Sequence, residues 1–231
     1  MDLPAVGTKV DEARRLLEEA RKLAPAVFTS SLGAEDMVLF DLIARDFREI
    51  EIATLDTGRL CPETYDLMDE AATHYRRKVK IYSPRHEGVE SFVRINGING
   101  FYESISQRKD CCEVRKLEPL KRALAGKRAW VTGMRRDQSV TRQALEPAAY
   151  DETQGLYKFS PLADWSQEDV WNYIRSNNVP YNALHDRGYP SIGCAPCTRA
   201  VAPGEDVRAG RWWWESAMSK ECGLHPQGVK A

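Results

Sequence analysis

Cysteines are the residues of this sequence whose type and spacing point most directly to chemistry. Cys111 and Cys112 are adjacent, and Cys194 and Cys197 form a second close pair further along the chain. Four thiolates in two pairs are the ligand set of a tetrahedral zinc site or of a cubane iron–sulfur cluster. Adjacent cysteines suit the separate iron corners of a cluster better than one small ion, so the spacing favours iron but leaves zinc open. Buried free thiols, or a redox disulfide between Cys194 and Cys197, are the weaker alternatives.

Two further cysteines stand outside these pairs. Cys222 is flanked by Lys220 and His225, groups that can favour a thiolate, and we interpret it as a candidate nucleophile. Cys61 follows Arg59-Leu60 without comparable neighbours, and we assign it to packing.

Hydroxyl, glycine and cationic side chains offer candidate anion sites. Ser30, Ser31 and Gly33 precede a predicted helix, whose N-terminal amides and dipole can hold an oxyanion. Lys116 stands one helical turn after Cys112 and is expected on the same helix face, where it would link a metal centre to a substrate.

Arginines form further candidate anion sites in two glycine-containing segments. Gly133 precedes Arg135 and Arg136, with Arg142 nearby, and a second segment reads Arg208-Ala209-Gly210-Arg211. Guanidinium groups beside glycines suit phosphate or sulfate, although a solvated charged face is the alternative. The chain has neither a Gly-Lys-Thr or Gly-Lys-Ser phosphate loop nor a Gly-x-Gly-x-x-Gly motif, which argues against ordinary ATPases and dinucleotide dehydrogenases.

Alternating strands and helices must position these residues. Apolar spacing predicts helices at 9–23, 35–47 and 61–76, and strands at 26–29, 50–55, 79–82 and 129–133. This alternation indicates an α/β fold with a mostly parallel sheet flanked by helices. Ligands bind beyond the carboxyl ends of such strands, so the turns at 30–34, 56–60 and 133–137 are expected to converge on one pocket.

The chain becomes loop-rich from about residue 178, where prolines and glycines interrupt any long element. We predict a single α/β domain over residues 1–205, which carries the metal site, and a mobile C-terminal tail over 206–231, which carries Cys222. The aromatic run Trp212-Trp213-Trp214 is expected to pin the tail to the body by burying a large area.

Charge and hydropathy exclude several classes of protein. The 231 residues carry a formal net charge of −1, so nothing in the composition favours binding to nucleic acid or to an anionic membrane. Apolar stretches such as Met37–Phe40 are too short to span a bilayer, and the start of the chain does not read as a secretory signal. We therefore expect a cytoplasmic protein with a small ligand, and the sequence leaves the oligomeric state open, homo-oligomers included.

Together these segments resemble the assimilatory adenylyl-sulfate (APS) reductases of the phosphoadenylyl-sulfate (PAPS) reductase family. The matching stretches are SSLGAEDMVL, LDTGRL, KDCCEVRKLEPL, WVTGMRRDQS, DWSQEDVW, LHDRGYPSIGCAPCTRAV, GEDVRAGRWWWE and KECGLH. The resemblance implies an adenine nucleotide α-hydrolase-like fold and one [4Fe–4S] cluster per chain on Cys111, Cys112, Cys194 and Cys197. It also implies substrate contacts from Ser30, Ser31, Gly33, Leu55, Gly58, Lys116, Gly133, Arg142, Arg208, Arg211 and His225. Arg135 and Arg136 are weaker matches as contacts, and Cys61 departs from the family pattern.

The chemistry that the resemblance implies begins with attack of the Cys222 thiolate on the sulfur of adenylyl sulfate. AMP leaves, and thioredoxin or a glutaredoxin-like dithiol protein then releases sulfite from the S-sulfocysteine. We expect the cluster to position Lys116 and tune the local field rather than to cycle its oxidation state.

Three other functions remain as alternatives. The first is reduction of the 3′-phosphorylated substrate, PAPS. The second is an ATP pyrophosphatase of the same fold, which would need a Ser-Gly-Gly-x-Asp-Ser loop that Leu32–Asp36 does not supply. The third is a non-enzymatic zinc or iron–sulfur module.

Overall fold

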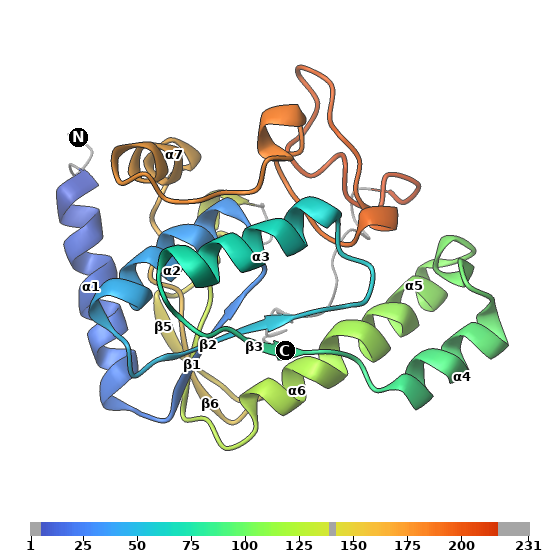
Figure 1. The fold of residues 1–231 in the computed structure, drawn as a ribbon, viewed down its shortest axis with the longest axis horizontal. Coiled ribbons are helices and arrows are strands. Elements are labelled where there is room, and N and C mark those ends of the chain that lie inside the picture. The colour runs from blue at the N-terminus through green and yellow to red at the C-terminus, as the bar shows by residue number, and fades with distance from the viewer. Residues whose placement is uncertain (1–5, 139–141, 217–231) are drawn as a thin grey trace. The chain divides into compact units, whose positions relative to one another are not determined.

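A computed structural model describes residues 6–138 and 142–216 of the chain (Figure 1). Its α-helices are α1 (Val6–Lys22), α2 (Ala34–Asp46), α3 (Pro62–His74), α4 (His86–Asn96), α5 (Ile105–Cys112), α6 (Glu118–Leu124) and α7 (Gln167–Ser176). Its strands are β1 (Ala26–Ser30), β2 (Glu51–Leu55), β3 (Lys80–Tyr82), β4 (Ala129–Val131), β5 (Ala148–Asp151) and β6 (Leu156–Phe159).

The strands form a six-stranded sheet in the order β3-β2-β1-β4-β6-β5. β1 runs parallel to both β2 and β4, with Phe28 opposite Ile52 on one side and Val131 on the other. β4 and β6 are also parallel, whereas β5 pairs antiparallel with β6. The predicted α/β class and mostly parallel sheet are therefore confirmed. The antiparallel edge was not predicted, because β5 is short and has no buried residue that would mark it as a strand.

The chain divides into two compact units, each built from interleaved segments. The first unit comprises residues 1–54, 66–80 and 124–182, and the second comprises residues 55–65, 81–123 and 183–231. The first holds most of the sheet with α1, α2 and α7, and the second holds α4 and α5. The separate tail expected from residue 206 stays a prediction.

In the first unit, helices pack on the buried centre of the sheet. α1 contacts β4 and β6, while α2 contacts β1 and α7. Ala26, Val27 and Phe28 of β1 are all buried, as expected for a central parallel strand covered on both faces. α7 begins with a capping box, in which the Ser166 hydroxyl accepts a hydrogen bond of 3.1 Å from the backbone N–H of Asp169.

The second unit has a smaller apolar centre that includes cysteines. Phe92, Phe101, Cys194, Cys197 and Trp212 form one buried cluster. From residue 178 to residue 216 the chain contains two short 3-10 helices, His185–Arg187 and Ala195–Cys197, besides turns and isolated bridges, which confirms the predicted loop-rich character. No helix within residues 6–138 and 142–216 is both long and apolar enough for a membrane span.

Candidate active site

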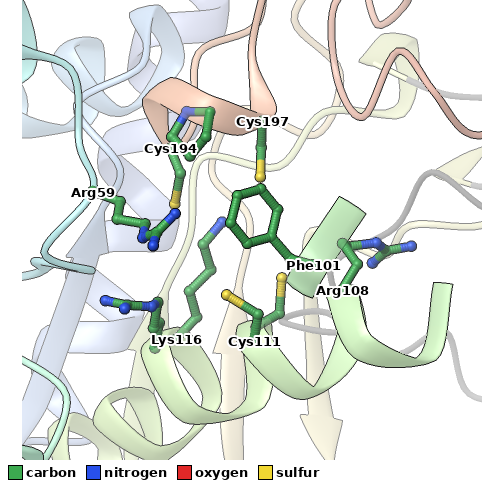
Figure 2. A pocket seen from close by; sticks show the side chains of 10 residues that line it. Arg59, Phe101, Arg108, Cys111, Lys116, Cys194 and Cys197 are labelled. Atoms are coloured by element: carbon green, nitrogen blue, oxygen red, sulfur yellow. The ribbon is translucent and has the colours of Figure 1, made fainter. Parts of the chain in front are cut away.

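Four cysteines of the second unit line one pocket (Figure 2). Cys111 and Cys112 end helix α5. Cys194 is the N-cap of a short 3-10 turn, Ala195–Cys197, and Cys197 is its last residue. Figure 2 shows the sulfur atoms of Cys111, Cys194 and Cys197 directed into the same space. The remaining lining residues are Arg59, Phe101, Arg108, Arg115, Lys116 and Pro196. The structure thus brings together two cysteine pairs that are far apart in the sequence.

The helix that carries the first pair widens immediately after Cys112. Ser104 caps α5 by accepting a hydrogen bond of 3.1 Å from the backbone N–H of Gln107. A π-helical turn, Glu113–Leu117, continues the helix, and such turns are frequent at functional sites. Within it Arg115 and Lys116 are buried, with 8% and 9% of their surface exposed. Two neighbouring cysteines and two neighbouring cations therefore line the pocket from one continuous helix.

The turn after β2 is tied to both cysteine-bearing segments. The Arg115 guanidinium donates a hydrogen bond of 2.7 Å to the carbonyl of Thr57, and the Thr57 hydroxyl lies 3.2 Å from Sγ of Cys194. Gly58 has a φ of 69°, a left-handed conformation that glycine adopts without strain. Leu55 ends the preceding strand. The predicted Leu55–Gly58 segment is thus fixed against the cysteine pocket.

The pocket holds its thiols at different proton affinities. Burial alone would raise the pKa of Cys194, but the Lys116 ammonium and the hydrogen bond from Thr57 lower it below its ordinary value. The pKa of Cys197 is raised to about 12, chiefly by burial and to a smaller extent by the neighbouring Cys194 thiolate. Burial also raises the pKa of Cys111. The protein itself therefore favours a thiolate at Cys194, whereas a bound metal would deprotonate the other thiols.

The donor set suits a metal group that takes thiolate ligands. Arg59, Arg108, Arg115 and Lys116 line the same pocket as the four sulfurs, so the walls can compensate the negative charge of several thiolates. Across the described residues, no group of three or more His, Cys, Asp or Glu side chains is spaced to hold a single metal ion.

Arg211, which we expected to contact the substrate, is buried within the second unit. It is buried with 8% exposure, and its Nη1 donates a hydrogen bond of 3.1 Å to the carbonyl of Ile192. Its guanidinium carbon lies 4.7 Å from the centre of the Trp212 ring. A Cβ atom added at Gly193 would lie 2.6 Å from that carbon. Arg208 is half-buried one turn earlier, and its carbonyl accepts a hydrogen bond of 2.9 Å from the backbone N–H of Arg211.

In the first unit, the loop between β1 and α2 folds around Asp36. The Asp36 carboxylate accepts hydrogen bonds of 2.5 and 2.7 Å from the backbone N–H and the hydroxyl of Ser31. The Ser30 hydroxyl accepts one of 3.1 Å from the N–H of Leu32. Gly133 approaches so closely that an added Cβ would clash with Oδ1 of Asp36. We expected Ser31 to donate hydrogen bonds to an oxyanion, but both of its donors are bound to the Asp36 carboxylate in this structure. Gly33 is the N-cap of the adjoining helix α2.

Burial raises the pKa of Asp36 to about 6, although its two hydrogen bonds from Ser31 oppose the shift. The neighbouring Glu35 carboxylate raises it further. Asp36 is therefore the carboxyl group of this loop that takes up a proton near neutral pH.

Glu35 pairs with Arg135, one of the arginines that the sequence offered as an anion site. Its Oε1 lies 2.8 Å from Nη2 of Arg135 and accepts a hydrogen bond of 2.9 Å from the side-chain amide of Gln138. Arg142 in turn donates a hydrogen bond to Gln138. Arg136 is ion-paired as well. Arg135 and Arg136 are thus engaged with carboxylates of the protein, and Arg142 is linked to them through Gln138.

Cys61 is the fifth described cysteine, and it does not line the pocket. Its side chain is buried, with 7% exposed, and its Sγ lies 3.9 Å from the carbonyl of Gly193. Burial raises the pKa of its thiol, which agrees with its assignment to packing.

The residues expected to bind substrate are distributed over both units. Those of the first unit are Ser30, Ser31, Gly33, Gly133 and Arg142. Those of the second unit are Leu55, Gly58, Lys116, Arg208 and Arg211. The proposed nucleophile Cys222 and His225 lie outside the described residues.

Several neighbours of the cysteines were missed from the sequence. Arg108 and Arg115 lie about one turn before and after the first pair on the same helix, so their spacing is a usable signal. Thr57 and Arg59 lie in the 56–60 turn, which we expected at the ligand pocket, but their proximity to the cysteines was not predicted. Phe101 comes from another segment, and no local pattern predicts its position.

Solved structures that superpose on this chain define its fold class. FMN adenylyltransferase of Candida glabrata, with FAD and pyrophosphate, superposes with a TM-score of 0.50 at 14% identity, covering 92% of this chain and 78% of that one. Phosphoadenylyl-sulfate (PAPS) reductase of Candida auris, a phosphate complex, superposes with a TM-score of 0.70 at 30% identity, covering 87% and 99%. The fold is therefore of the adenine nucleotide α-hydrolase-like class.

The family follows from the sequence matches. Residues 25–200 match the phosphoadenosine phosphosulfate reductase domain. Adenosine 5′-phosphosulfate reductase of Allochromatium vinosum is 56% identical over 210 residues, covering 91% of this chain and 82% of the relative. The enzyme of the same name from Burkholderia cepacia is 50% identical over 223 residues, covering 96% and 89%. The chain belongs to the phosphoadenosine phosphosulfate reductase family.

Proposed function

We propose that this chain reduces adenylyl sulfate to sulfite and AMP, with thioredoxin or a glutaredoxin-like dithiol protein as reductant. The observation that carries the proposal is the pocket in which two cysteine pairs meet Lys116, in a member of this family. Relatives named adenosine 5′-phosphosulfate reductase at 56% and 50% identity support the choice of substrate. The free thiols of the described cysteines agree with a reducing compartment, and we assign the reaction to the cytoplasm.

We assign one [4Fe–4S] cluster per chain to Cys111, Cys112, Cys194 and Cys197. The support is their common pocket and the cations that share its walls. When bound, such a cluster would supply a fixed anionic centre, and Lys116, which lines the same pocket, would be held by its charge. Because the dithiol partner supplies both electrons, the reaction does not require a redox change at the pocket.

The first chemical step is transfer of the sulfonate group to Cys222. Its thiolate attacks the sulfur of adenylyl sulfate, the bond from that sulfur to the bridging phosphate oxygen breaks, and AMP leaves. Thiolate and substrate are both anionic, so Lys116, Arg208, Arg211 and Arg142 have the task of neutralising the phosphosulfate charge. Gly33, Gly58, Gly133, Ser30, Ser31, Leu55 and His225 complete the proposed contacts. The N–H groups of Gly33 and Gly58 are hydrogen-bonded to the Ser31 hydroxyl and the Asp56 carboxylate in this structure, so their contact with a nucleotide requires an exchange of partners.

The second step releases sulfite. A thiolate of the partner attacks Sγ of the S-sulfocysteine, sulfite leaves with the electron pair of the S–S bond, and a mixed disulfide forms. The partner's second thiol then displaces Cys222, so that the partner is oxidised to a disulfide and Cys222 regains its thiolate. The tail must present Cys222 first to the substrate and then to the partner.

Reduction of the 3′-phosphorylated substrate is the second candidate. The family description and the 30% identical structure of a PAPS reductase favour it. Steady-state kinetics with the two substrates side by side distinguish the candidates, and we expect kcat/KM to be higher for adenylyl sulfate. A higher value for the 3′-phosphorylated substrate would reverse the assignment.

Sulfite production by iron-loaded protein with adenylyl sulfate, thioredoxin and a thioredoxin-reducing system tests the proposal. Cys222→Ser should lower the rate by at least about a thousandfold, because the nucleophile is removed. Cys61→Ser is the matched control and should keep the rate within about threefold, since a packing cysteine does no chemistry. Equal losses in both variants, or no sulfite from the wild type, would contradict the proposal.

A further inference from the structure

A buried ion pair joins the cysteine helix to the chain that leads to Cys222. Nε and Nη2 of Arg108 donate hydrogen bonds of 2.8 Å each to the two carboxylate oxygens of Glu215. The two side chains are only 1% and 3% exposed. A paired, parallel arrangement of this kind fixes both distance and orientation, and either charge alone would be costly at such burial.

Arg108 also contacts the cysteine pocket. It lines that pocket from α5, about one helical turn before Cys112 (Figure 2). Burial alone would lower its pKa, but the Glu215 carboxylate and then the Cys112 sulfur raise it. Its guanidinium carbon lies 4.7 Å from the centre of the Trp212 ring. One guanidinium therefore interacts with a cysteine, a carboxylate and an indole.

Glu215 lies on a segment that is held at a second point by the other cysteine pair. The backbone N–H of Trp212 donates a hydrogen bond of 3.1 Å to the carbonyl of Cys197, and that of Glu215 donates one of 2.8 Å to the carbonyl of Trp212. Trp214 packs edge-on against Tyr102, with ring centres 4.5 Å apart. The turn at residues 212–215 is thus attached to both halves of the four-cysteine pocket.

The length of chain beyond this turn limits where the nucleophile can reach. From Glu215 to Cys222 the chain runs seven residues, which span at most about 25 Å when fully extended. If the Arg108–Glu215 pair is lost, the tether becomes longer and its starting point is no longer fixed. The effective concentration of a tethered thiolate at a bound substrate falls as the tether lengthens and loosens.

We propose that Arg108 is a positioning residue, which anchors the Cys222-bearing segment to the Cys111–Cys112 helix through Glu215 and so sets the rate of sulfonate transfer. This inference rests on the proposed function in taking Cys222 as the nucleophile. The anchoring itself is a property of the described residues and has its own readout.

The chain contains a matched control for this pair. Arg199 and Glu205, also in the second unit, form a two-bond ion pair at 2.9 and 3.0 Å. Their side chains are 40% and 35% exposed, so this pair has the same chemistry without the burial or the contact with a cysteine. Its loss should have little effect.

The test compares Arg108→Lys and Glu215→Gln with the controls Arg199→Lys and Glu205→Gln, all iron-loaded. Hydrogen exchange of the peptide covering residues 208–216 should be about tenfold faster in the two anchor variants. Formation of the Cys222 sulfonate in a single turnover should be roughly tenfold slower, while AMP affinity and iron per chain stay at wild-type values. The control variants should match the wild type in every readout.

Unchanged exchange in the anchor variants would overturn the anchoring, and wild-type sulfonate formation despite faster exchange would overturn the effect on rate. Absence of any sulfonate on the wild-type protein would instead contradict the proposed function, and the exchange result would still stand by itself. If the single variants do not fold, the double variant Arg108→Met with Glu215→Leu leaves no unpaired buried charge. We expect it to show the same faster exchange and slower transfer.

Discussion

At the scale of single residues, glycines make room for the charged side chains of the candidate site. Gly193 leaves the space that the Arg211 guanidinium fills, and Gly133 leaves the space for the Asp36 carboxylate. Neither glycine has a positive φ, so close approach rather than backbone conformation explains them. The sequence shows glycines beside cationic residues, but it does not show which side chain packs against each glycine.

Gly193→Ala should displace Arg211, because an added Cβ would lie 2.6 Å from the guanidinium carbon. Arg211 would lose its hydrogen bond to the carbonyl of Ile192, and a buried polar group would be left poorly satisfied. We expect a loss of about 1–3 kcal/mol in the free energy of unfolding, measured by urea titration. Gly7→Ala is the control, since no atom lies within 4 Å of its added Cβ; equal stability of the two variants would contradict the steric account.

Asp36 makes stability depend on pH. Its pKa is raised from 3.8 to about 6, so the folded protein holds this proton more tightly than the unfolded chain. The stability it contributes is fully present below about pH 4 and is lost as the pH rises through about 6. Asp36→Asn removes this titration, so the free energy of unfolding of the wild type should fall relative to the variant by up to about 3 kcal/mol between pH 4 and 7.

Urea unfolding of both proteins across that pH range measures this difference. Asp11→Asn, at an exposed position of α1, is the control. A wild-type-to-variant difference that does not change with pH would show that Asp36 has an ordinary proton affinity in the folded protein.

At the scale of elements, α5 shows why part of the site could not be predicted. The central strands and α2 have continuous apolar runs, because the strands form the buried centre of the sheet and α2 packs against β1, and the sequence predicted them. The segment Ile105–Cys112 has almost no apolar periodicity, since its inner face carries Arg108, Cys111 and Cys112 and faces a pocket rather than a core. Periodicity detects burial against apolar neighbours, so a helix whose buried face is charged or sulfur-bearing gives no such signal.

Arg115, on the π-helical turn after α5, is expected to hold the 55–58 turn in place. Its guanidinium reaches the carbonyl of Thr57 at 2.7 Å, while the Thr57 hydroxyl lies 3.2 Å from Sγ of Cys194. Arg115→Lys keeps the charge but not the planar fork, so the 55–58 turn should loosen. We expect AMP affinity to fall by about fivefold to tenfold, an effect measured by calorimetry.

Iron per chain is the accompanying measurement for Arg115→Lys, and it should stay at the wild-type value. Lys121→Arg, an exposed position on α6, is the control. Unchanged AMP affinity would separate the turn from nucleotide binding, and loss of iron would show that Arg115 acts on the cysteines instead.

At the scale of the whole molecule, each unit is assembled from segments distant in sequence. Residues 55–65, 81–123 and 183–231 form the second unit, and no composition change marks its boundaries. The sequence predicted that the two cysteine pairs need one another, because metal chemistry demands a complete ligand set. It could not predict which other segments join them, since such contacts depend on tertiary packing and leave no local pattern.

Removal of the proposed iron–sulfur cluster should therefore act on one unit more than on the other. The cysteine pocket lies wholly in the second unit, and its walls carry several cations. Without thiolate ligands held by metal, we expect hydrogen exchange in α5 and around Cys194–Cys197 to become at least about tenfold faster after anaerobic chelation. Exchange in β1 and β4 should stay within about twofold; uniform acceleration of both units would contradict this account.

The central claim, transfer of a sulfonate group to Cys222, is tested most directly by intact-protein mass after anaerobic incubation with adenylyl sulfate and no thiol. AMP is quantified in the same tube, with Cys222→Ser as the control. The account predicts one sulfonate adduct per chain that maps to Cys222, matched by an equal amount of AMP and absent from the variant. Iron-loaded protein that gives neither adduct nor AMP would contradict the covalent route, as would an adduct that maps to Cys61.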